Sequence, residues 1–360
     1  MSQDVAIPDR SKTAVLRRIS EIGFEDRPVG RPGPDDALIK VMAVGICGSD
    51  VHFYEHGRIG GRVVRFPHVL GHECAGVVVA TGENVTRLKP GDRVAIEPGI
   101  ACFRCENCKA GKYNICPEVQ FLSAPPTDGA LTEYLVHPAH LLHAIPDHLG
   151  FDAATLAEPF SVGLHAAERA GVKPGSAVLI TGLGPIGQMA LIAAQAFGAG
   201  TVIVSDIEPF RLELARKLGA THVVNVVESS LAEAVERAVG GRGVDIAMDT
   251  SGQPRVIEAS IPLIKRGGKM LSIGFPNAER VPVDITGMIM KEIDYLTSYR
   301  FANTFPLAIR LLASGRFNTD LLLTDHYPLE QTREALERAR VNKVGSMKVV
   351  VHPHSSSCSM

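Results

Sequence analysis

Residues 177–187 read Ala-Val-Leu-Ile-Thr-Gly-Leu-Gly-Pro-Ile-Gly. The run Ala177–Thr181 is apolar, as a strand that is covered on both faces requires. Glycines then follow at the spacing G-x-G-x-x-G, and a helix is predicted over 185–197 with proline at its first turn, where the missing N–H costs nothing. A strand, a glycine turn and a helix in this order indicate a dinucleotide-binding unit.

Each glycine of the turn has a separate physical task. Gly182 permits the tight turn, Gly184 lets the backbone approach a pyrophosphate, and Gly187 lets the helix pack on the strand. The helix N-terminus supplies N–H donors to the phosphates. The predicted cofactor-binding residues of the turn are therefore Gly182, Gly184, Pro185, Ile186 and Gly187.

Asp206 ends the next predicted strand, Thr201–Asp206, where a carboxylate binds the hydroxyls of the adenosine ribose. Ile207 and Glu208 follow it, and neither is basic, so NAD is favoured over NADP. Arg211 is nearby and is expected to lie along the adenine. The alternative is a packing turn followed by a surface aspartate.

Beyond this unit, the chain has two regions that differ in their secondary-structure patterns. From about Leu164 strands alternate with helices, which predicts a doubly wound parallel sheet. The first 150 residues instead contain short β segments separated by glycine and proline, with few helical patterns. The further strands are expected over 37–44, 74–80, 92–97, 222–225, 245–250, 269–274 and 346–352, and the further helices over 210–218, 231–239 and 255–264.

Four cysteines in the first part, Cys102, Cys105, Cys108 and Cys116, have the spacing C-x2-C-x2-C-x7-C. Four thiolates this close suit the tetrahedral all-sulfur coordination of a structural zinc ion. Two disulfides are the alternative, but the N-terminal residues lack the pattern of a signal peptide and nothing else suggests export. The interpretation is a zinc lobe over 99–117 in a protein of the reducing cytoplasm.

The composition narrows the function classes. The formal net charge of −2 gives no basic surface field, so nucleic acid is not an expected partner. Apolar runs are too short to span a bilayer, so no membrane association is expected either. The stretch 352–357 is short and polar, and we expect it to be disordered.

A second set of possible metal ligands is scattered through the sequence. Cys47 lies in a glycine-flanked turn, and His72 and Glu73 follow Gly71. Glu158 lies where the β-rich region meets the region of alternating strands and helices. Thiolate, imidazole and carboxylate are all zinc ligands. Each residue also has an ordinary interpretation, as a small core residue, a hydrogen-bonded histidine or an acid at a helix N-terminus. Because these residues are far apart in the sequence, their spacing alone does not show that they form one site.

A resemblance to a known family groups these residues into one site. The motif Gly71-His72-Glu73 with Gly76, Gly82 and Val85, the sequence around Cys47, the cysteine lobe and the glycine turn occur in the order found in zinc-containing medium-chain alcohol dehydrogenases. The chain most resembles the polyol (sorbitol/xylitol) dehydrogenase branch. The branch markers are residues 48–52, 57–60, 157–159 and 303–306.

This resemblance implies an α/β protein with a GroES-like β-rich catalytic domain and a Rossmann domain. The expected division is 1–160 for the catalytic domain, 161–299 for the NAD-binding domain and 300–360 for the return to the catalytic domain. One catalytic and one structural Zn²⁺ per chain are implied. Cys47, His72 and Glu73 would hold the catalytic ion, and Glu158 would either coordinate it or hydrogen-bond the water on it; which glutamate binds directly stays open.

The resemblance also implies the reaction, which is oxidation of a secondary hydroxyl of a sugar alcohol to the ketose with hydride transfer to NAD. Ser49 and His52 would carry the proton away, while Phe121 and Arg300 would line the substrate site. A homotetramer or homodimer is implied as well. Two alternatives remain, an L-threonine dehydrogenase-like zinc oxidoreductase and a nucleotide-binding protein without catalysis.

Overall fold

The computed structural model describes residues 7–276, 278–341 and 344–354. It divides into two compact units, the first made of Met1–Glu158 and Ile309–Met360 and the second of Pro159–Ala308. The chain leaves the first unit within α4 (Ala157–Ala170) and returns within α10 (Phe305–Ala313). Residues 300–308, which we expected in the catalytic domain, pack with the second unit, where the Thr304 hydroxyl donates to the Ser161 carbonyl at 3.0 Å.

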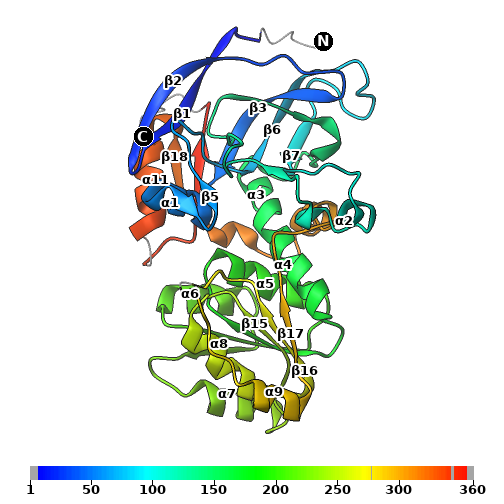
Figure 1. The fold of residues 1–360 in the computed structure, drawn as a ribbon, viewed down its shortest axis with the longest axis vertical. Helices are drawn as coiled ribbons and strands as arrows, with labels where there is room; N and C mark the ends of the chain where they lie inside the picture. Colours follow the sequence, from blue (N-terminus) through cyan, green and yellow to red (C-terminus); the bar gives the residue numbers. More distant parts are fainter. Residues whose placement is uncertain (1–6, 277, 342–343, 355–360) are drawn as a thin grey trace. The chain divides into compact units, whose positions relative to one another are not determined.

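The second unit is built on a six-stranded sheet whose order is β14-β13-β12-β15-β16-β17 (Figure 1). All five neighbouring pairs are parallel. When the strands are numbered in chain order with β12 as the first, this arrangement reads 3-2-1-4-5-6, which is the order of a Rossmann fold. The expectation of a Rossmann domain is therefore confirmed. The strands are β12 (Ala177–Thr181), β13 (Thr201–Asp206), β14 (His222–Asn225), β15 (Val244–Asp249), β16 (Ile264–Ser272) and β17 (Asp294–Thr297).

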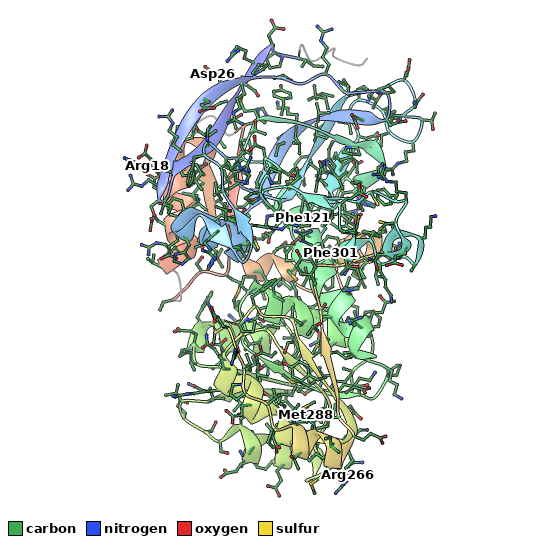
Figure 2. The ribbon with its side chains drawn as sticks, in the orientation of Figure 1. Arg18, Asp26, Phe121, Arg266, Met288 and Phe301 are labelled. Atoms are coloured by element: carbon green, nitrogen blue, oxygen red, sulfur yellow. The ribbon has the colours of Figure 1, made fainter. Side chains whose placement is uncertain are left out.

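Of the four helices expected in this unit, three lie close to the predicted ranges, and the helix over Ile285–Lys291 is an addition that we did not expect. We expected a helix over 255–264, but α8 ends at Ser260, a 3-10 turn covers Ile261–Leu263, and Ile264 already begins β16. Pro262 explains this difference, because it has no N–H to continue an α-helical ladder. The helices are α5 (Pro185–Ala196), α6 (Pro209–Lys217), α7 (Leu231–Val239), α8 (Pro254–Ser260) and α9 (Ile285–Lys291), which carries the buried Met288 (Figure 2).

The first unit is built on a seven-stranded sheet with the order β11-β7-β6-β3-β19-β18, and β10 also pairs with β3. The last strand, β19, is antiparallel to β3 and parallel to β18, so the end of the chain enters the middle of a sheet built mostly from its beginning. The strands are β3 (Asp36–Gly45), β6 (Glu73–Thr81), β7 (Arg93–Ile96), β10 (Tyr134–Pro138), β11 (Leu142–Ala144), β18 (Leu323–Pro328) and β19 (Lys348–His352).

A long antiparallel hairpin, β1 (Arg10–Arg18) with β2 (Glu21–Pro28), accompanies this sheet, and the side chains of Arg18 and Asp26 extend from it (Figure 2). Short helices join the strands, although helical patterns are few in this part of the sequence. They are α1 (Gly48–His56), α2 (Glu106–Lys109), α3 (Phe151–Thr155) and α11 (Thr332–Val341). Among the described residues, no helix has both the length and the apolar character that a membrane span needs.

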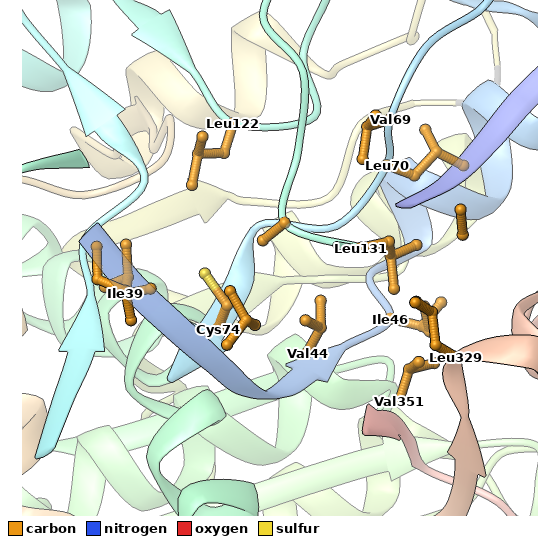
Figure 3. Close-up of a cluster of buried hydrophobic side chains, with 14 of the residues drawn as sticks. Ile39, Val44, Ile46, Val69, Leu70, Cys74, Leu122, Leu131, Leu329 and Val351 are labelled. Carbon is orange, nitrogen blue, oxygen red and sulfur yellow. The ribbon is translucent and has the colours of Figure 1, made fainter. Parts of the chain in front are cut away.

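The core of the first unit forms between its central strands (Figure 3). Ile39 and Val44 of β3 and Val351 of β19 are fully buried. Cys74 of β6 belongs to the same core, where burial raises the pKa of its thiol. This cysteine, which the sequence left without a role, is therefore a small apolar packing residue.

The C-terminal stretch is more ordered than its composition suggests. His352 is the last residue of β19, and His354 bonds through its Nε2 to the Glu133 carbonyl at 2.9 Å. The expectation of disorder over 352–357 is therefore wrong for 352–354, because strand pairing and this bond hold them, while 355–357 lie outside the described residues.

Gly76 of β6 tests this packing. A Cβ at this position would lie 2.2 Å from the Lys40 carbonyl oxygen of β3, so Gly76→Ala forces the two strands apart. We expect it to destabilise the first unit by about 2 kcal/mol or more. Gly61→Ala is the matched control, because a Cβ there meets no atom within 4 Å. Equal thermal midpoints for the two variants would contradict this account of the strand contact.

Candidate active site

Strand register brings three predicted metal ligands together. In the antiparallel pair of β3 and β6, Gly45 lies opposite Glu73, so the end of one strand meets the start of the other. Cys47 follows β3 directly, and His72 precedes β6. The donor atoms of Cys47, His72 and Glu73 all lie within 4.8 Å of one another. A thiolate, an imidazole and a carboxylate fit the three protein ligands of a catalytic zinc site.

Asp50, a residue that the sequence analysis did not single out, organises this cluster from within α1. It is fully buried, and its carboxylate accepts the backbone N–H groups of Cys47 and Gly71, each at 3.0 Å, and the Ser123 hydroxyl at 2.5 Å. Its Oδ1 lies 3.5 Å from His72 Nδ1. Burial opposes ionisation, but the charge of His72 and these hydrogen bonds hold the pKa of Asp50 at about 2. The carboxylate therefore orients the histidine.

Lys348 of β19 neutralises Glu73. Its Nζ lies 2.8 Å and 2.6 Å from the two carboxylate oxygens and 3.3 Å from the Ile46 carbonyl, and both side chains are buried. Burial is the largest single influence and lowers the pKa of Lys348. The charge of Glu73, the hydrogen bonds to it and the other acidic groups nearby together outweigh burial, so the net shift of the pKa is upward. No local pattern marked this lysine, because it is 275 residues away from Glu73 in the chain.

Glu158 is buried near the same cluster, at the start of α4. Its charge contributes to the raised pKa values of Cys74 and Lys348. Among the described residues its carboxylate does not belong to the set of converging donor atoms. The structure thus groups Glu73, and not Glu158, with Cys47 and His72.

Ser49 and His52 are three residues apart on α1, so they share one helix face. Ser49 is half-buried and His52 is exposed. The His52 and His56 rings meet edge to face with 4.6 Å between their centroids. Partial burial and then the neighbouring His56 lower the pKa of His52, so its imidazole is neutral near neutral pH.

The two residues expected to line the substrate site belong to different units. Phe121, labelled in Figure 2, is buried in the first unit. Its ring centroid lies 5.4 Å from that of His72, so it packs beside one of the possible zinc ligands. Arg300 is half-buried in the second unit, where its guanidinium lies 4.9 Å from the Tyr299 ring centroid.

The four lobe cysteines converge as well. Their sulfur atoms lie within 4.8 Å of one another, with Cys102 to Cys108 at 3.9 Å and Cys105 to Cys108 at 3.5 Å. A disulfide requires about 2.05 Å, whereas sulfurs that share one tetrahedral zinc at 2.3 Å lie about 3.8 Å apart. Backbone N–H groups of Arg104 and Cys105 lower the pKa of Cys102 to about 7, which favours the thiolate. The geometry fits a zinc ion and not two disulfides.

The glycine turn has the form that the phosphates require. Gly182 has φ +86, and a Cβ on Gly187 would lie 2.0 Å from the Gly182 carbonyl oxygen. Gly184 caps α5, and a Cβ there would meet no atom within 4 Å, so its backbone is open to a ligand. Thr250, which follows β15, the strand beside β12, donates its hydroxyl to the Gly182 carbonyl at 2.7 Å and so braces the turn.

Asp206 is tied to the same turn. Its Oδ2 accepts the Leu183 N–H at 2.6 Å, and its Oδ1 accepts the N–H groups of Ile207 and Glu208 at 2.7 and 2.9 Å. Arg211 of α6 lies 3.9 Å from the carboxylate. These bonds fix the orientation of the carboxylate, so a ribose would meet an acceptor that is already in place.

Comparison with known proteins agrees with this geometry. Residues 33–147 match the family described as "Alcohol dehydrogenase GroES-like domain", and residues 185–314 match "Zinc-binding dehydrogenase". The chain is 49% identical to the sorbitol dehydrogenase of Bacillus subtilis over 97% of its own length and 99% of the relative. It is 40% identical to a putative D-xylulose reductase of Rhizobium meliloti, over 95% and 99% of the two chains.

Solved structures show the same fold. An Escherichia coli oxidoreductase/dehydrogenase of unknown specificity superposes with a TM-score of 0.91 and 38% identity, covering 95% of this chain and 99% of the other. An E. coli alcohol dehydrogenase complexed with NADH gives a TM-score of 0.89 and 27% identity, covering 96% and 100%. The chain belongs to the zinc-binding alcohol dehydrogenase family. It is an oxidoreductase that uses zinc and a nicotinamide dinucleotide, and its resemblance to the polyol branch is confirmed.

Cysteine substitutions separate the two metal sites. Cys47→Ser should remove one zinc ion per chain and lower kcat/KM on the order of a thousandfold, while NAD binding and the thermal midpoint stay close to those of the wild type. Cys105→Ser should remove the other ion and lower the thermal midpoint, with a smaller loss of activity per folded molecule. Elemental analysis, NAD titration and thermal unfolding measure these effects. Full activity in Cys47→Ser would contradict the ligand set.

Asp206→Ala should change the cofactor preference. Losing a charged acceptor weakens NAD, on the order of tenfold to a hundredfold, and removes the repulsion of a 2′-phosphate, so the ratio of kcat/KM for NAD to that for NADP should fall. Asp206→Asn is the control that keeps a carbonyl acceptor for the Leu183 N–H. An unchanged ratio in both variants would show that this carboxylate does not contact the ribose.

Proposed function

We propose that this protein oxidises a secondary hydroxyl of a sugar alcohol of the sorbitol or xylitol type to the ketose, with NAD as the hydride acceptor. The convergence of Cys47, His72 and Glu73 carries the proposal. The sequence similarity to a sorbitol dehydrogenase and a putative D-xylulose reductase supports the substrate class.

Cys47, His72 and Glu73 would hold the catalytic zinc. When bound, zinc supplies Lewis acidity that lowers the pKa of the hydroxyl, and NAD supplies the acceptor for hydride. The chain itself supplies orientation, since Asp50 positions His72 and Lys348 positions Glu73. Glu158, buried beside this set, would accept a hydrogen bond from water or substrate in the site.

The proton of the hydroxyl needs a route out of a closed site. Ser49 is the first carrier in our proposal because it is half-buried on the helix that follows Cys47. His52 is the outer carrier because it shares that helix face, is exposed, and has a lowered pKa that keeps its imidazole free to accept a proton. The nicotinamide ribose would connect the two.

The remaining hydroxyls of a polyol need polar partners, and its carbon chain needs a wall. Arg300 offers fixed guanidinium donors, and Phe121 offers an apolar ring beside His72. For the nucleotide, we propose Gly182, Gly184, Pro185, Ile186 and Gly187 as the pyrophosphate turn, Asp206 as the ribose partner and Arg211 along the adenine. A single zinc in the cysteine lobe would be structural.

We also propose a cytoplasmic location and a homotetrameric or homodimeric assembly. All six cysteines among the described residues are free thiols, which suits a reducing compartment. The assembly rests on the family resemblance and is tested by analytical ultracentrifugation.

The direct test is NADH formation by purified protein with xylitol, sorbitol, L-threonine and ethanol, each with and without a strong zinc chelator. We expect turnover with a polyol that the chelator abolishes. Turnover with L-threonine alone would favour the threonine dehydrogenase reaction. No turnover with zinc-loaded, NAD-binding protein would contradict the proposed substrate class.

The proton route predicts a particular pH dependence. A base must be neutral to accept a proton, so kcat/KM should fall as the pH drops through the pKa of His52, which lies below its ordinary value of 6.5. His56→Ala removes a neighbour that lowers the pKa of His52 and should move this acid limb to higher pH. Glu55→Gln is the opposite control, because Glu55 raises the pKa of His52. The limb should disappear in His52→Gln; its survival would exclude His52 from the route.

A further inference from the structure

Three further side chains converge in the first unit, away from the zinc-ligand sets described above. Asp152 belongs to α3, His326 to β18 and His352 to β19. One donor atom from each lies within 4.8 Å of the other two. Neither the family resemblance nor the proposed reaction uses these residues.

The distances suit a shared ion. His352 Nε2 lies 2.8 Å from Asp152 Oδ1, and His326 Nδ1 lies 3.1 Å from Asp152 Oδ2. Nitrogen and oxygen ligands at about 2.1 Å from one tetrahedral ion lie about 3.4 Å apart, so only small movements of the side chains are needed. The two imidazole rings are stacked, with 5.6 Å between their centroids and 8° between their planes, and one nitrogen of each ring faces the same carboxylate.

Strand register places the two histidines side by side. In the parallel pair of β18 and β19, His326 lies opposite Val350, and the residues paired in this way point to the same face. His352 is two positions beyond Val350 and therefore also points to that face, because side chains alternate with a period of two. The adjacency of the imidazoles is thus a property of the sheet.

Asp152 is held in place by the segment before it. Arg93 of β7 donates to the carbonyls of Pro146, Asp147 and Leu149 at 3.0, 2.6 and 2.7 Å. The same guanidinium lies 4.4 Å from the ring centroid of Phe151, the residue next to Asp152. These contacts hold the backbone that leads into Asp152, which lowers the entropic cost of binding an ion there.

We propose that Asp152, His326 and His352 bind a third divalent transition-metal ion, separate from the catalytic and structural zinc. Two imidazoles and one carboxylate are ligands for zinc or nickel, and not for calcium or magnesium, which prefer oxygen. The His326 side chain is 46% exposed, so water completes the coordination and the ion exchanges with solvent.

This ion would link strands β18 and β19, near the C-terminus, to helix α3. Its ligands come from one segment before the second unit and two segments after it, and they meet only in the folded protein. An ion that binds the folded state alone stabilises it by mass action. The ion would therefore hold β19 at His352, at the opposite end of the strand from Lys348.

Nickel is the probe, because it is distinguished from resident zinc by elemental analysis. Protein that holds two zinc ions per chain, one for each zinc-ligand set described above, is dialysed to equilibrium against buffered Ni²⁺. Bound nickel and zinc are then counted per chain, with thermal unfolding followed in parallel. We expect the wild type to bind one nickel without losing zinc, and its thermal midpoint to rise. In His326→Gln and Asp152→Asn the apparent Kd should be at least about tenfold weaker and the rise should vanish.

His222→Gln is the matched control, because His222 is an exposed histidine of the second unit and lies outside the cluster. It should bind nickel as the wild type does. Nickel binding that is equal in His326→Gln and the wild type, or nickel that enters only as zinc leaves, would overturn the proposal. Because the readouts are metal content and unfolding, the result is independent of the polyol dehydrogenase assay.

Discussion

The buried ion pair between Lys348 and Glu73 is the contact on which the first unit depends most. Both side chains are almost fully buried, at 2% and 1% exposure, so neither charge has water as an alternative partner. Removing one member of such a pair typically costs about 3–5 kcal/mol, because the other charge stays buried and unpaired. Lys348 also donates to the Ile46 carbonyl, and Ile46 donates its N–H to the Val349 carbonyl. The returning strand is thereby fastened to the turn that carries Cys47.

This contact connects stability with chemistry. A thiolate and a carboxylate side by side repel each other, and Lys348 places a positive charge against the carboxylate without occupying a ligand position on the metal. Asp50 plays the complementary part for His72, and its four polar contacts leave it little freedom. The geometry of the proposed zinc site is therefore set by residues that are not ligands.

The two cysteine-containing centres differ in how they depend on the rest of the fold. The lobe cysteines lie within one short segment, and their sulfurs approach through local turns such as α2. The cluster of Cys47, His72 and Glu73 instead depends on the pairing of β3 with β6, and on β19 for the neutralising lysine. Substitutions that disturb strand pairing should therefore displace Cys47, His72 and Glu73 directly. The lobe cysteines should be less affected.

Local patterns in the amino-acid sequence determined the Rossmann unit and the cysteine lobe, because the glycine turn, the strand and helix periods and the cysteine spacing all act over a few residues. They also identified Cys47, His72 and Glu73, although only resemblance to a family joined these residues. Tertiary structure alone decided that Asp50 and Lys348 support the cluster, that Glu158 stays outside the converging donor atoms, and that Asp152 meets His326 and His352. Each of these depends on strand register or buried charge between segments far apart in the chain, and no local spacing encodes such a contact.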